Sequence, residues 1–261
     1  MPRCLTVAGS DSGGGAGIQA DLKAFAALGC WGTSAIVALT AQNTVGVTAI
    51  HECPPELVRA QIDAVLDDIG ADAVKTGMLF SRATVETVAD ALAPRGLPLV
   101  VDPVMVSSTG ARLLRDDAVD ALVSRLFPLA TVVTPNHHEA EALAGLPGAS
   151  KRELAEALHA RGAAAVLVTG GHGEPVDHLF DGVEHLELLV PRHERASTHG
   201  AGCTHSASLA ALLARGATLA DAAERAAAIA AEAVRDGLAG LGAGDGPVDV
   251  LHLTTRQEAT R

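Results

Sequence analysis

The sequence predicts an α/β protein in which helices cover a mainly parallel β-sheet. Short apolar runs alternate along the chain with longer segments of helical periodicity, and the short runs are apolar on both faces. Strands of this kind are typical of parallel sheets, because crossover helices bury both faces. A chain of 261 residues, 48% of them hydrophobic and 19% charged, can bury the core that such a fold needs.

Six apolar runs are predicted to be strands and eight segments to be helices. The strands are expected at residues 5–8, 33–39, 73–76, 99–101, 131–134 and 165–169. The helices are expected at residues 16–28, 56–69, 83–92, 116–126, 139–143, 151–160, 202–214 and 219–238. Residues 176–190, in which Asp181-Gly182 separates two apolar runs, are expected to form a small antiparallel hairpin at the sheet edge. No linker or repeat interrupts the pattern, so residues 1–261 are predicted to form a single domain.

Charge and composition narrow the choice of partners. The formal net charge is −12 and no basic run occurs, so we expect neither nucleic acid nor a membrane as a partner. The same acidity repels a polyanion such as ATP, and a nucleotide site here needs a cation and oriented backbone amides. No stretch approaches the roughly 18 apolar residues of a membrane span, and the N-terminus lacks a signal-peptide core. The four cysteines lack zinc or C-x-x-C spacing, which fits a cytoplasmic protein.

A glycine-rich heptapeptide, Thr198-His199-Gly200-Ala201-Gly202-Cys203-Thr204, precedes a predicted helix. The backbone amides of Gly200, Ala201 and Gly202 at a helix start can converge on a phosphate or on a phosphoryl group in transfer. Cys203 follows directly, and its thiol can accept a proton. This pattern indicates phosphoryl transfer. The alternative, a glycine-rich helix start with a buried thiol, is equally compatible with the heptapeptide alone.

A second glycine-rich segment spans residues 8–21, after the first predicted strand and at the start of the first predicted helix. It is not a Walker A loop, because no Lys-Ser/Thr follows its last glycine, and the chain has no G-x-G-x-x-G fingerprint. Asp21 falls in the first turns of that helix, where a carboxylate can face a pocket. The alternative is a solvated acid stabilised by the helix dipole.

Two further patterns have competing interpretations. Asn136 and Glu139 stand three apart at a predicted helix start, where they can form a capping box, hold Mg²⁺ beside nucleotide phosphates, or do both. A Gly-x-Gly pattern at residues 242–244 is followed by Asp245, but Pro247 opposes a helix there. The amides of residues 242–244 therefore have no helix N-terminus behind them, and we predict a turn.

Taken together, six segments occur in an order that resembles the hydroxymethylpyrimidine/phosphomethylpyrimidine kinases of thiamine biosynthesis, in the ribokinase-like superfamily. These segments are Ala8-Gly9-Ser10-Asp11 with residues 14–23, Ala41-Gln42-Asn43-Thr44, Lys75-Thr76-Gly77-Met78-Leu79, Val101-Asp102-Pro103-Val104-Met105, residues 134–141 and residues 198–204. The resemblance extends over nearly the whole chain, and the ordered set is far more specific than any one segment.

The resemblance implies a three-layer α/β/α sandwich with a mainly parallel central sheet, usually a homodimer. It also implies Mg-ATP-dependent phosphorylation of the hydroxymethyl group of 4-amino-5-hydroxymethyl-2-methylpyrimidine and then of its monophosphate. By matching position, the pyrimidine would be contacted by Gly9, Asp21, Gln42, Met78 and Val104. ATP would be bound by Asn136, Thr169, Gly200 and Gly202, and Mg²⁺ by Glu139 and Asp102. Gly200, Ala201 and Gly202 would form the anion hole, with Cys203 as the base.

The expected chemistry of Cys203 follows from its place at a helix start. A helix N-terminus lowers the pKa of a thiol, so we expect a thiolate that accepts the hydroxymethyl proton near neutral pH.

Three positions depart from the family pattern. Thr169 and Ser108 stand where the family usually has lysine, and Ser197 stands where it has asparagine. Three side chains are candidates to replace the charge of the missing lysines, namely Arg112, Arg195 and His199. The departures keep two alternatives open. One is a pyridoxal/pyridoxine kinase, and the other is a catalytically impaired pyrimidine-binding protein.

Overall fold

The structure, a computed structural model, describes residues 1–107, 109–170, 175–191, 193 and 197–255. In this part of the chain, nine strands form one sheet in the order β3-β2-β1-β4-β5-β6-β7-β8-β9. The strands are β1 (Arg3–Asp11), β2 (Trp31–Gln42), β3 (Val47–Glu52), β4 (Ala73–Thr76), β5 (Leu99–Val101), β6 (Val132–Val133), β7 (Val166–Val168), β8 (Val176–Phe180) and β9 (His185–Leu189). The strands from β2 to β7 in this order are parallel, and β3, β8 and β9 are antiparallel at the two edges. The mainly parallel sheet and the predicted hairpin are confirmed.

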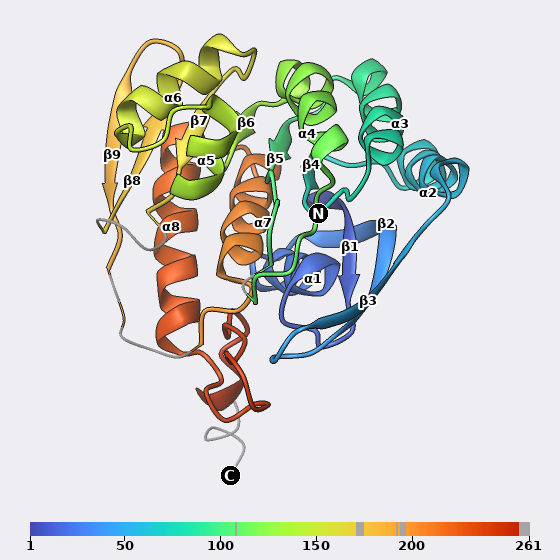
Figure 1. Ribbon diagram of the computed structural model, residues 1–261. Coiled ribbons are helices and arrows are strands. Elements are labelled where there is room, and N and C mark those ends of the chain that lie inside the picture. Colours follow the sequence, from blue (N-terminus) through green and yellow to red (C-terminus); the bar gives the residue numbers. More distant parts are fainter. Residues whose placement is uncertain (108, 171–174, 192, 194–196, 256–261) are drawn as a thin grey trace.

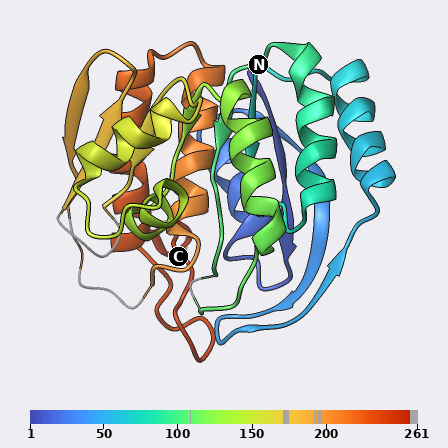
Figure 2. The same ribbon diagram turned by 45° about the horizontal axis from the view of Figure 1, so that its top comes forward.

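Helices cover both faces of this sheet (Figures 1 and 2). They are α1 (Gly17–Ala27), α2 (Pro55–Asp68), α3 (Arg82–Leu92), α4 (Asp116–Ala121), α5 (His137–Ala144), α6 (Lys151–Ala160), α7 (Ala201–Ala214) and α8 (Leu219–Arg235). Helices α2 to α6 share one hydrophobic cluster with the sheet, and α1, α7 and α8 share the other. The protein is therefore a three-layer α/β/α sandwich, as predicted.

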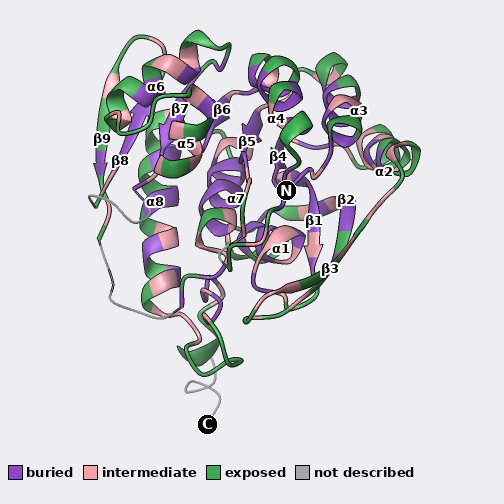
Figure 3. Cartoon of the chain, viewed as in Figure 1, coloured by how far each residue is buried: buried purple, intermediate pink, exposed green. Residues whose placement is uncertain are grey.

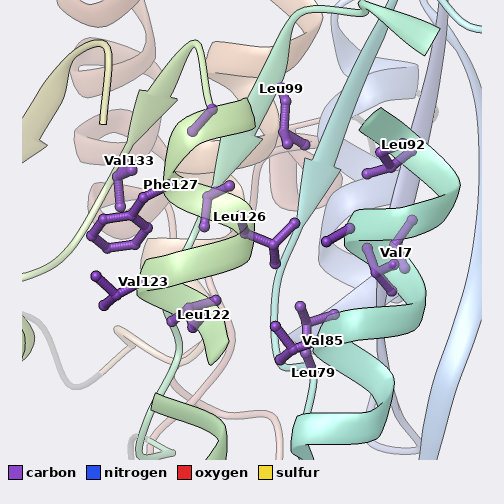
Figure 4. Packing of buried hydrophobic residues seen from close by; sticks show 14 of the residues in the cluster. Val7, Leu79, Val85, Leu92, Leu99, Leu122, Val123, Leu126, Phe127 and Val133 are labelled. Atoms are coloured by element: carbon purple, nitrogen blue, oxygen red, sulfur yellow. The ribbon is translucent and has the colours of Figure 1, made fainter. Parts of the chain in front are cut away.

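The two clusters meet at the central strands, which are buried on both faces (Figure 3). Val101 packs in the cluster under α2 to α6, and its neighbour Val100 packs in the cluster under α1, α7 and α8, because successive side chains of a strand point to opposite faces. Figure 4 shows Phe127, which follows α4, beside Val123 and Val133 of β6. This close packing fixes the positions of the strand ends.

The differences from the predicted elements have local causes. Strand β3 was not predicted, because at the sheet edge most of its side chains are exposed or half-buried and no apolar alternation results. The predicted helix at residues 116–126 is α-helical only to Ala121 and continues as a π-helix over Leu122–Leu126. No helix in the described ranges combines the length and the hydropathy that a bilayer span requires.

Candidate active site

Polar residues gather where the parallel strands end. Strand β1 ends at Asp11 and β2 at Gln42, while Asp102 follows β5 directly. Thr169, which follows β7, forms a β-bridge with Asn136. The carboxyl ends of parallel strands lie at one edge of the sheet, where open α/β sheets bind their ligands. The structure thus brings the predicted pyrimidine, metal and nucleotide residues to the same edge.

A fully buried ion pair lies beneath this edge. Lys75 Nζ donates hydrogen bonds to Asp21 Oδ1 at 2.8 Å and Oδ2 at 3.0 Å, and Thr6 Oγ1 donates to Asp21 Oδ2 at 2.6 Å. Neither Lys75 nor Asp21 has exposed side-chain surface. The alternative of a solvated acid is therefore wrong, because the Asp21 carboxylate is buried against Lys75. A contact between Asp21 and the pyrimidine stays a prediction.

Lys75 is the site residue that the sequence interpretation missed. Its Nζ also lies 3.9 Å from Asp102 Oδ2, and it is close enough to Cys203 for each charge to shift the other's pKa. Burial lowers the pKa of Lys75, but Asp21, Cys203 and Asp102 together raise it above its ordinary value, so the ammonium stays charged. A detectable signal existed. A lysine in the middle of an otherwise apolar strand such as β4 needs a buried partner.

The thiol of Cys203 has a different acidity from the one expected. Burial raises its pKa to about 12; Lys75 lowers it and the carboxylates of Asp21 and Asp102 raise it. The Gly17 amide donates a hydrogen bond to the thiol, which also lowers the pKa. The pKa is therefore raised rather than lowered as expected, because burial and two nearby carboxylates outweigh the helix start and the lysine.

The start of α7 has the geometry of an anion hole, with one correction. Gly200 is the N-cap at φ 84°, and a Cβ atom there would lie 1.8 Å from the Gly15 carbonyl oxygen, so only glycine fits. The Ala201 amide donates to the Thr198 carbonyl at 3.0 Å, which removes it from the predicted set of anion donors. The Gly202 and Cys203 amides come before the first bond of the helix ladder and face outward along its axis. The amides of Gly202 and Cys203 are therefore the candidate anion donors of this helix start, and the contribution of Gly200 stays a prediction.

Asp11 and His199 tie the two glycine-rich loops together. Asp11 accepts hydrogen bonds from the amides of Gly13 at 2.7 Å, Gly15 at 3.0 Å and Ala16 at 2.8 Å, and its Oδ2 lies 3.1 Å from His199 Nε2. The hydrogen bond to His199 and those to the amides lower the pKa of Asp11, although burial opposes them. His199 is buried against Asp11, so it does not replace a missing lysine at the phosphates. The pair instead fixes the spacing of the two loops.

Asn136 and Glu139 form the predicted capping box of α5. Asn136 Oδ1 accepts from the Glu139 amide at 3.0 Å, and Glu139 Oε2 accepts from the Asn136 amide at 3.0 Å. Glu139 Oε1 also accepts from the Met105 amide at 3.3 Å. Burial and the neighbouring Asp102 carboxylate raise the pKa of Glu139 to about 8.

This pair of carboxyl groups suits a hard cation. Glu139 and Asp102 repel each other in a buried setting, and a cation would relieve that repulsion. Oxygen donors of this kind fit Mg²⁺, which binds through one or two carboxylates together with substrate phosphates. Within the described ranges no cluster of three or more His, Cys, Asp or Glu side chains could hold a metal by itself. The donor set therefore fits Mg²⁺ that arrives with a nucleotide.

Apart from Asp21 on α1, the predicted pyrimidine residues lie near the ends of β1, β2, β4 and β5. A Cβ atom at Gly9 would lie 2.6 Å from Met78 Cε, so the Met78 side chain covers the Gly9 backbone. Gln42 is half-buried, and its Oε1 accepts from Thr40 Oγ1 at 3.1 Å. The amide of Val104 donates to the Asp102 carbonyl at 2.9 Å, which keeps this half-buried valine beside the carboxylate.

Of the two remaining candidates to replace the missing lysines, only Arg112 lies within the residues that the structure describes. Arg112 is exposed and pairs with Asp116, so its charge is already partly compensated. Ser108 and Arg195 lie outside the described residues. The Thr169 amide donates to the Pro135 carbonyl at 2.9 Å, which places this residue beside Asn136 without adding a charge.

The fold and the amide-lined helix start define a small-molecule kinase of the ribokinase-like class. Residues 11–249 match the family described as phosphomethylpyrimidine kinase. A hydroxymethylpyrimidine/phosphomethylpyrimidine kinase of Rhizobium meliloti is 50% identical over 257 residues, covering 95% of this chain and 96% of that protein. The chain belongs to the phosphomethylpyrimidine kinase family, as its motifs indicated.

One further relative and two solved structures are also similar to this chain. A thiamine biosynthesis bifunctional protein of Geobacter sulfurreducens is 51% identical over 94% of this chain, and the chain spans 51% of that protein's length. Among solved structures, a Bacillus subtilis pyridoxal kinase in complex with ADP matches with a TM-score of 0.89 and 37% identity, over 97% of this chain and 99% of that one. A Clostridium difficile phosphomethylpyrimidine kinase matches with a TM-score of 0.78 and 38% identity, over 87% of this chain and 96% of that one.

Proposed function

We propose that this protein uses ATP to phosphorylate the hydroxymethyl group of 4-amino-5-hydroxymethyl-2-methylpyrimidine, and then the resulting monophosphate. The observation that carries the proposal is the pair of outward amides at Gly202 and Cys203, placed beside Asp102 and above the Lys75–Asp21 ion pair. The family match over residues 11–249 supports the same activity. The product, a pyrimidine diphosphate, serves thiamine synthesis.

The amides at the start of α7 contribute most of the electrostatic stabilisation of the phosphoryl group in transfer. Phosphoryl transfer depends on in-line positioning and on neutralising charge on the equatorial oxygens, with little covalent chemistry for the protein. The Gly202 and Cys203 amides are fixed by the turn at Thr198 and by the Gly200–Gly15 contact, so they need no reorganisation during transfer. Removing one such donor costs about 10²–10³-fold in rate in other enzymes.

Asp102 and Glu139 are the residues that would hold Mg²⁺, and Asn136 and Thr169 lie beside them for the nucleotide. When bound, Mg²⁺ offsets negative charge on the phosphate oxygens. Asp102 is itself oriented by Ser206, whose Oγ donates to Asp102 Oδ2 at 2.8 Å. Because Ser206 lies on α7, the anion-binding helix and the candidate metal carboxylate are held by the same hydrogen bond.

Cys203 is the candidate acceptor of the hydroxymethyl proton, and Lys75 is the group that makes this role possible. The thiol must lose its proton first, and the Asp21 and Asp102 carboxylates oppose that loss. Neutralising Asp102 would remove one of the two carboxylates that raise the thiol pKa, and the Lys75 ammonium and the Gly17 amide would then lower it against burial and Asp21 alone. Asp21 acts through Lys75, which it fixes by two hydrogen bonds.

The pyrimidine contacts are assigned to Gly9, Gln42, Met78 and Val104. The Gln42 amide offers both a donor and an acceptor to a ring amine and a ring nitrogen. Met78, which follows β4, and Val104, which follows β5, supply apolar surface for the pyrimidine ring.

We also propose that residues 1–261 act as a single domain and that the protein is a cytoplasmic homodimer. Light scattering on the purified protein tests the oligomeric state.

Mass spectrometry after incubation with Mg-ATP tests the proposed activity directly. We expect the pyrimidine monophosphate first and the diphosphate later, and no product when ATP is omitted. A folded, ATP-binding protein that yields neither product would refute the activity and would support the alternative of a pyrimidine-binding protein. Product formation excludes that alternative.

Pyridoxal phosphorylation is the second candidate function. It is favoured by the match to a Staphylococcus aureus pyridoxal kinase in complex with pyridoxal, with a TM-score of 0.88 and 32% identity over 96% of this chain. Competition between the two substrates at equal concentration separates the candidates. A higher kcat/KM for pyridoxal than for the aminopyrimidine would reverse the assignment.

A further inference from the structure

The turn predicted near the C-terminus lies between two loops of the site. We call residues 240–246 the glycine segment. It forms no helix, as predicted, and residues 240–244 are exposed. It therefore contributes little to either hydrophobic cluster, yet its polar contacts go to the loop before α7 and to the turn after Gln42.

The first contact holds the loop that leads into the anion-binding helix. Asp245 Oδ1 accepts from the Thr198 amide at 3.0 Å, and Asp245 Oδ2 accepts from Thr198 Oγ1 at 2.7 Å. The next residue continues the contact, because the His199 amide donates to the Gly246 carbonyl at 3.3 Å. The Thr198 carbonyl is the acceptor of the Ala201 amide, so a shift of Thr198 moves the turn that aims the outward amides.

The second contact holds the turn that follows Gln42. The Gly244 amide donates to Thr44 Oγ1 at 3.2 Å. A Cβ atom at Gly244 would lie 2.0 Å from the Thr44 carbonyl oxygen, so the two backbones are in direct contact. On its other side the same turn meets the first glycine-rich loop, where Ser12 Oγ donates to the Gln42 carbonyl at 2.7 Å.

We propose that the glycine segment is a brace that sets the distance between the pyrimidine turn and the anion hole, with Asp245 as a positioning residue for phosphoryl transfer. The inference rests on the proposed function. Asp245 acts through Thr198 on the amides at Gly202 and Cys203, and Gly244 acts through Thr44 on Gln42. The two ends of the segment therefore have separable effects, on the rate of transfer and on the binding of the pyrimidine.

The Asp245→Ala variant tests the first contact, with Glu153→Ala as its matched control. Glu153 Oε2 accepts from the Ser150 amide at 2.8 Å and from Ser150 Oγ at 2.7 Å, so both variants remove the same two kinds of hydrogen bond from a surface carboxylate. We expect kcat to fall about tenfold in Asp245→Ala, with KM for ATP within about threefold, because misplaced donors lose transition-state binding. Asp245→Asn keeps one acceptor and should recover part of the rate. A kcat equal to that of Glu153→Ala would overturn the role of Asp245.

The Gly244→Ala variant tests the second contact, with Gly240→Ala as its control. A Cβ atom at Gly240 meets nothing within 4 Å, and neither glycine has a positive φ. We expect Gly244→Ala to raise KM for the pyrimidine about fivefold or more with a smaller change in kcat, because Thr44 must move and Gln42 with it. Equal KM values for the two variants would overturn the brace at this end.

A double-variant cycle separates positioning from loss of fold. Thr198→Val removes the hydroxyl that Asp245 accepts from, so its effect on kcat should not add to that of Asp245→Ala. Full additivity would contradict a shared pathway. Wild-type protein assayed in parallel distinguishes failure of the proposed function from failure of the brace. Wild type without pyrimidine kinase activity refutes the proposed function, whereas active wild type with unaffected variants refutes only the brace.

Discussion

Replacing Lys75 by methionine is the sharpest test of how the site is held. The substitution keeps the length of the side chain and removes the ammonium, which leaves the Asp21 carboxylate buried with Thr6 as its remaining partner. Breaking a buried ion pair in this way typically costs about 3–5 kcal/mol, since the remaining charge is uncompensated. The exposed pair Arg82–Glu86 gives the matched control, because Arg82→Met should cost under about 1 kcal/mol.

The cost should depend on pH in a defined direction. Burial raises the pKa of Asp21, and without Lys75 nothing charged opposes that rise. The folded state then binds more protons than the unfolded state above the ordinary carboxyl pKa of about 3.9, so the free energy of unfolding of Lys75→Met falls as the pH rises. We expect the deficit relative to wild type to grow as the pH rises above the ordinary carboxyl pKa of about 3.9.

Urea unfolding measures this deficit, and it should be followed by far-UV circular dichroism rather than by tryptophan fluorescence. The chain has one tryptophan and no tyrosine, and Trp31 is 57% exposed, so its fluorescence reports poorly on the core. The double variant Lys75→Met/Asp21→Leu should recover most of the stability without recovering kcat, because no cation remains beside Cys203. A deficit at pH 7.5 within about 1 kcal/mol of Arg82→Met, or a double variant with wild-type kcat, would refute the reasoning.

Three further predictions address single residues. Cys203→Ala should lower kcat at least about tenfold while calorimetry shows ATP affinity within threefold of wild type, since only the proton acceptor is lost; an unchanged kcat would remove Cys203 from the mechanism. The pKa of Glu139 is raised from 4.5 to about 8, so the folded state binds an extra proton between these two pH values. The free energy of unfolding of the wild type should therefore fall as the pH rises from 5 to 8, by at most about 5 kcal/mol. In metal-free urea titrations, Glu139→Gln should show no such fall. Thr169→Lys restores the charge usual in the family and should lower KM for ATP about threefold or more; an unchanged KM would show that the position does not face the phosphates.

The sequence predicted the fold well where apolar runs are cleanly bounded. Residues 73–76 and 99–101 were predicted at the observed limits of β4 and β5, because glycine or polar residues follow each run and both faces are buried. Strand β3 was missed, since an edge strand with exposed side chains has no such pattern. The order of the motifs likewise sufficed to identify the family.

The chemistry of the site was less predictable, because it depends on groups that meet only in three dimensions. The local rule that a helix start lowers a thiol pKa gave the wrong direction for Cys203. The groups that decide the outcome are Asp21 on α1, Lys75 on β4 and Asp102 after β5, and no spacing in the sequence shows that they converge. The amide of Ala201 was misassigned for a similar reason, since its partner became evident only with the turn at Thr198.

The balance of charge at the strand ends explains why backbone amides carry so much of the proposed mechanism. Asp21 and Asp102 lie beside the buried ammonium of Lys75, and the neighbouring Glu139 adds a third carboxyl group, whose pKa is raised by burial and by Asp102. A nucleotide triphosphate adds further negative charge, so its affinity must come from a divalent cation and from dipoles that carry no net charge. ATP affinity should therefore depend strongly on the Mg²⁺ concentration and only weakly on monovalent salt. Salt screens buried electrostatic interactions less than it screens the interactions of exposed lysines. Steep loss of ATP affinity with added KCl at saturating Mg²⁺ would contradict this account.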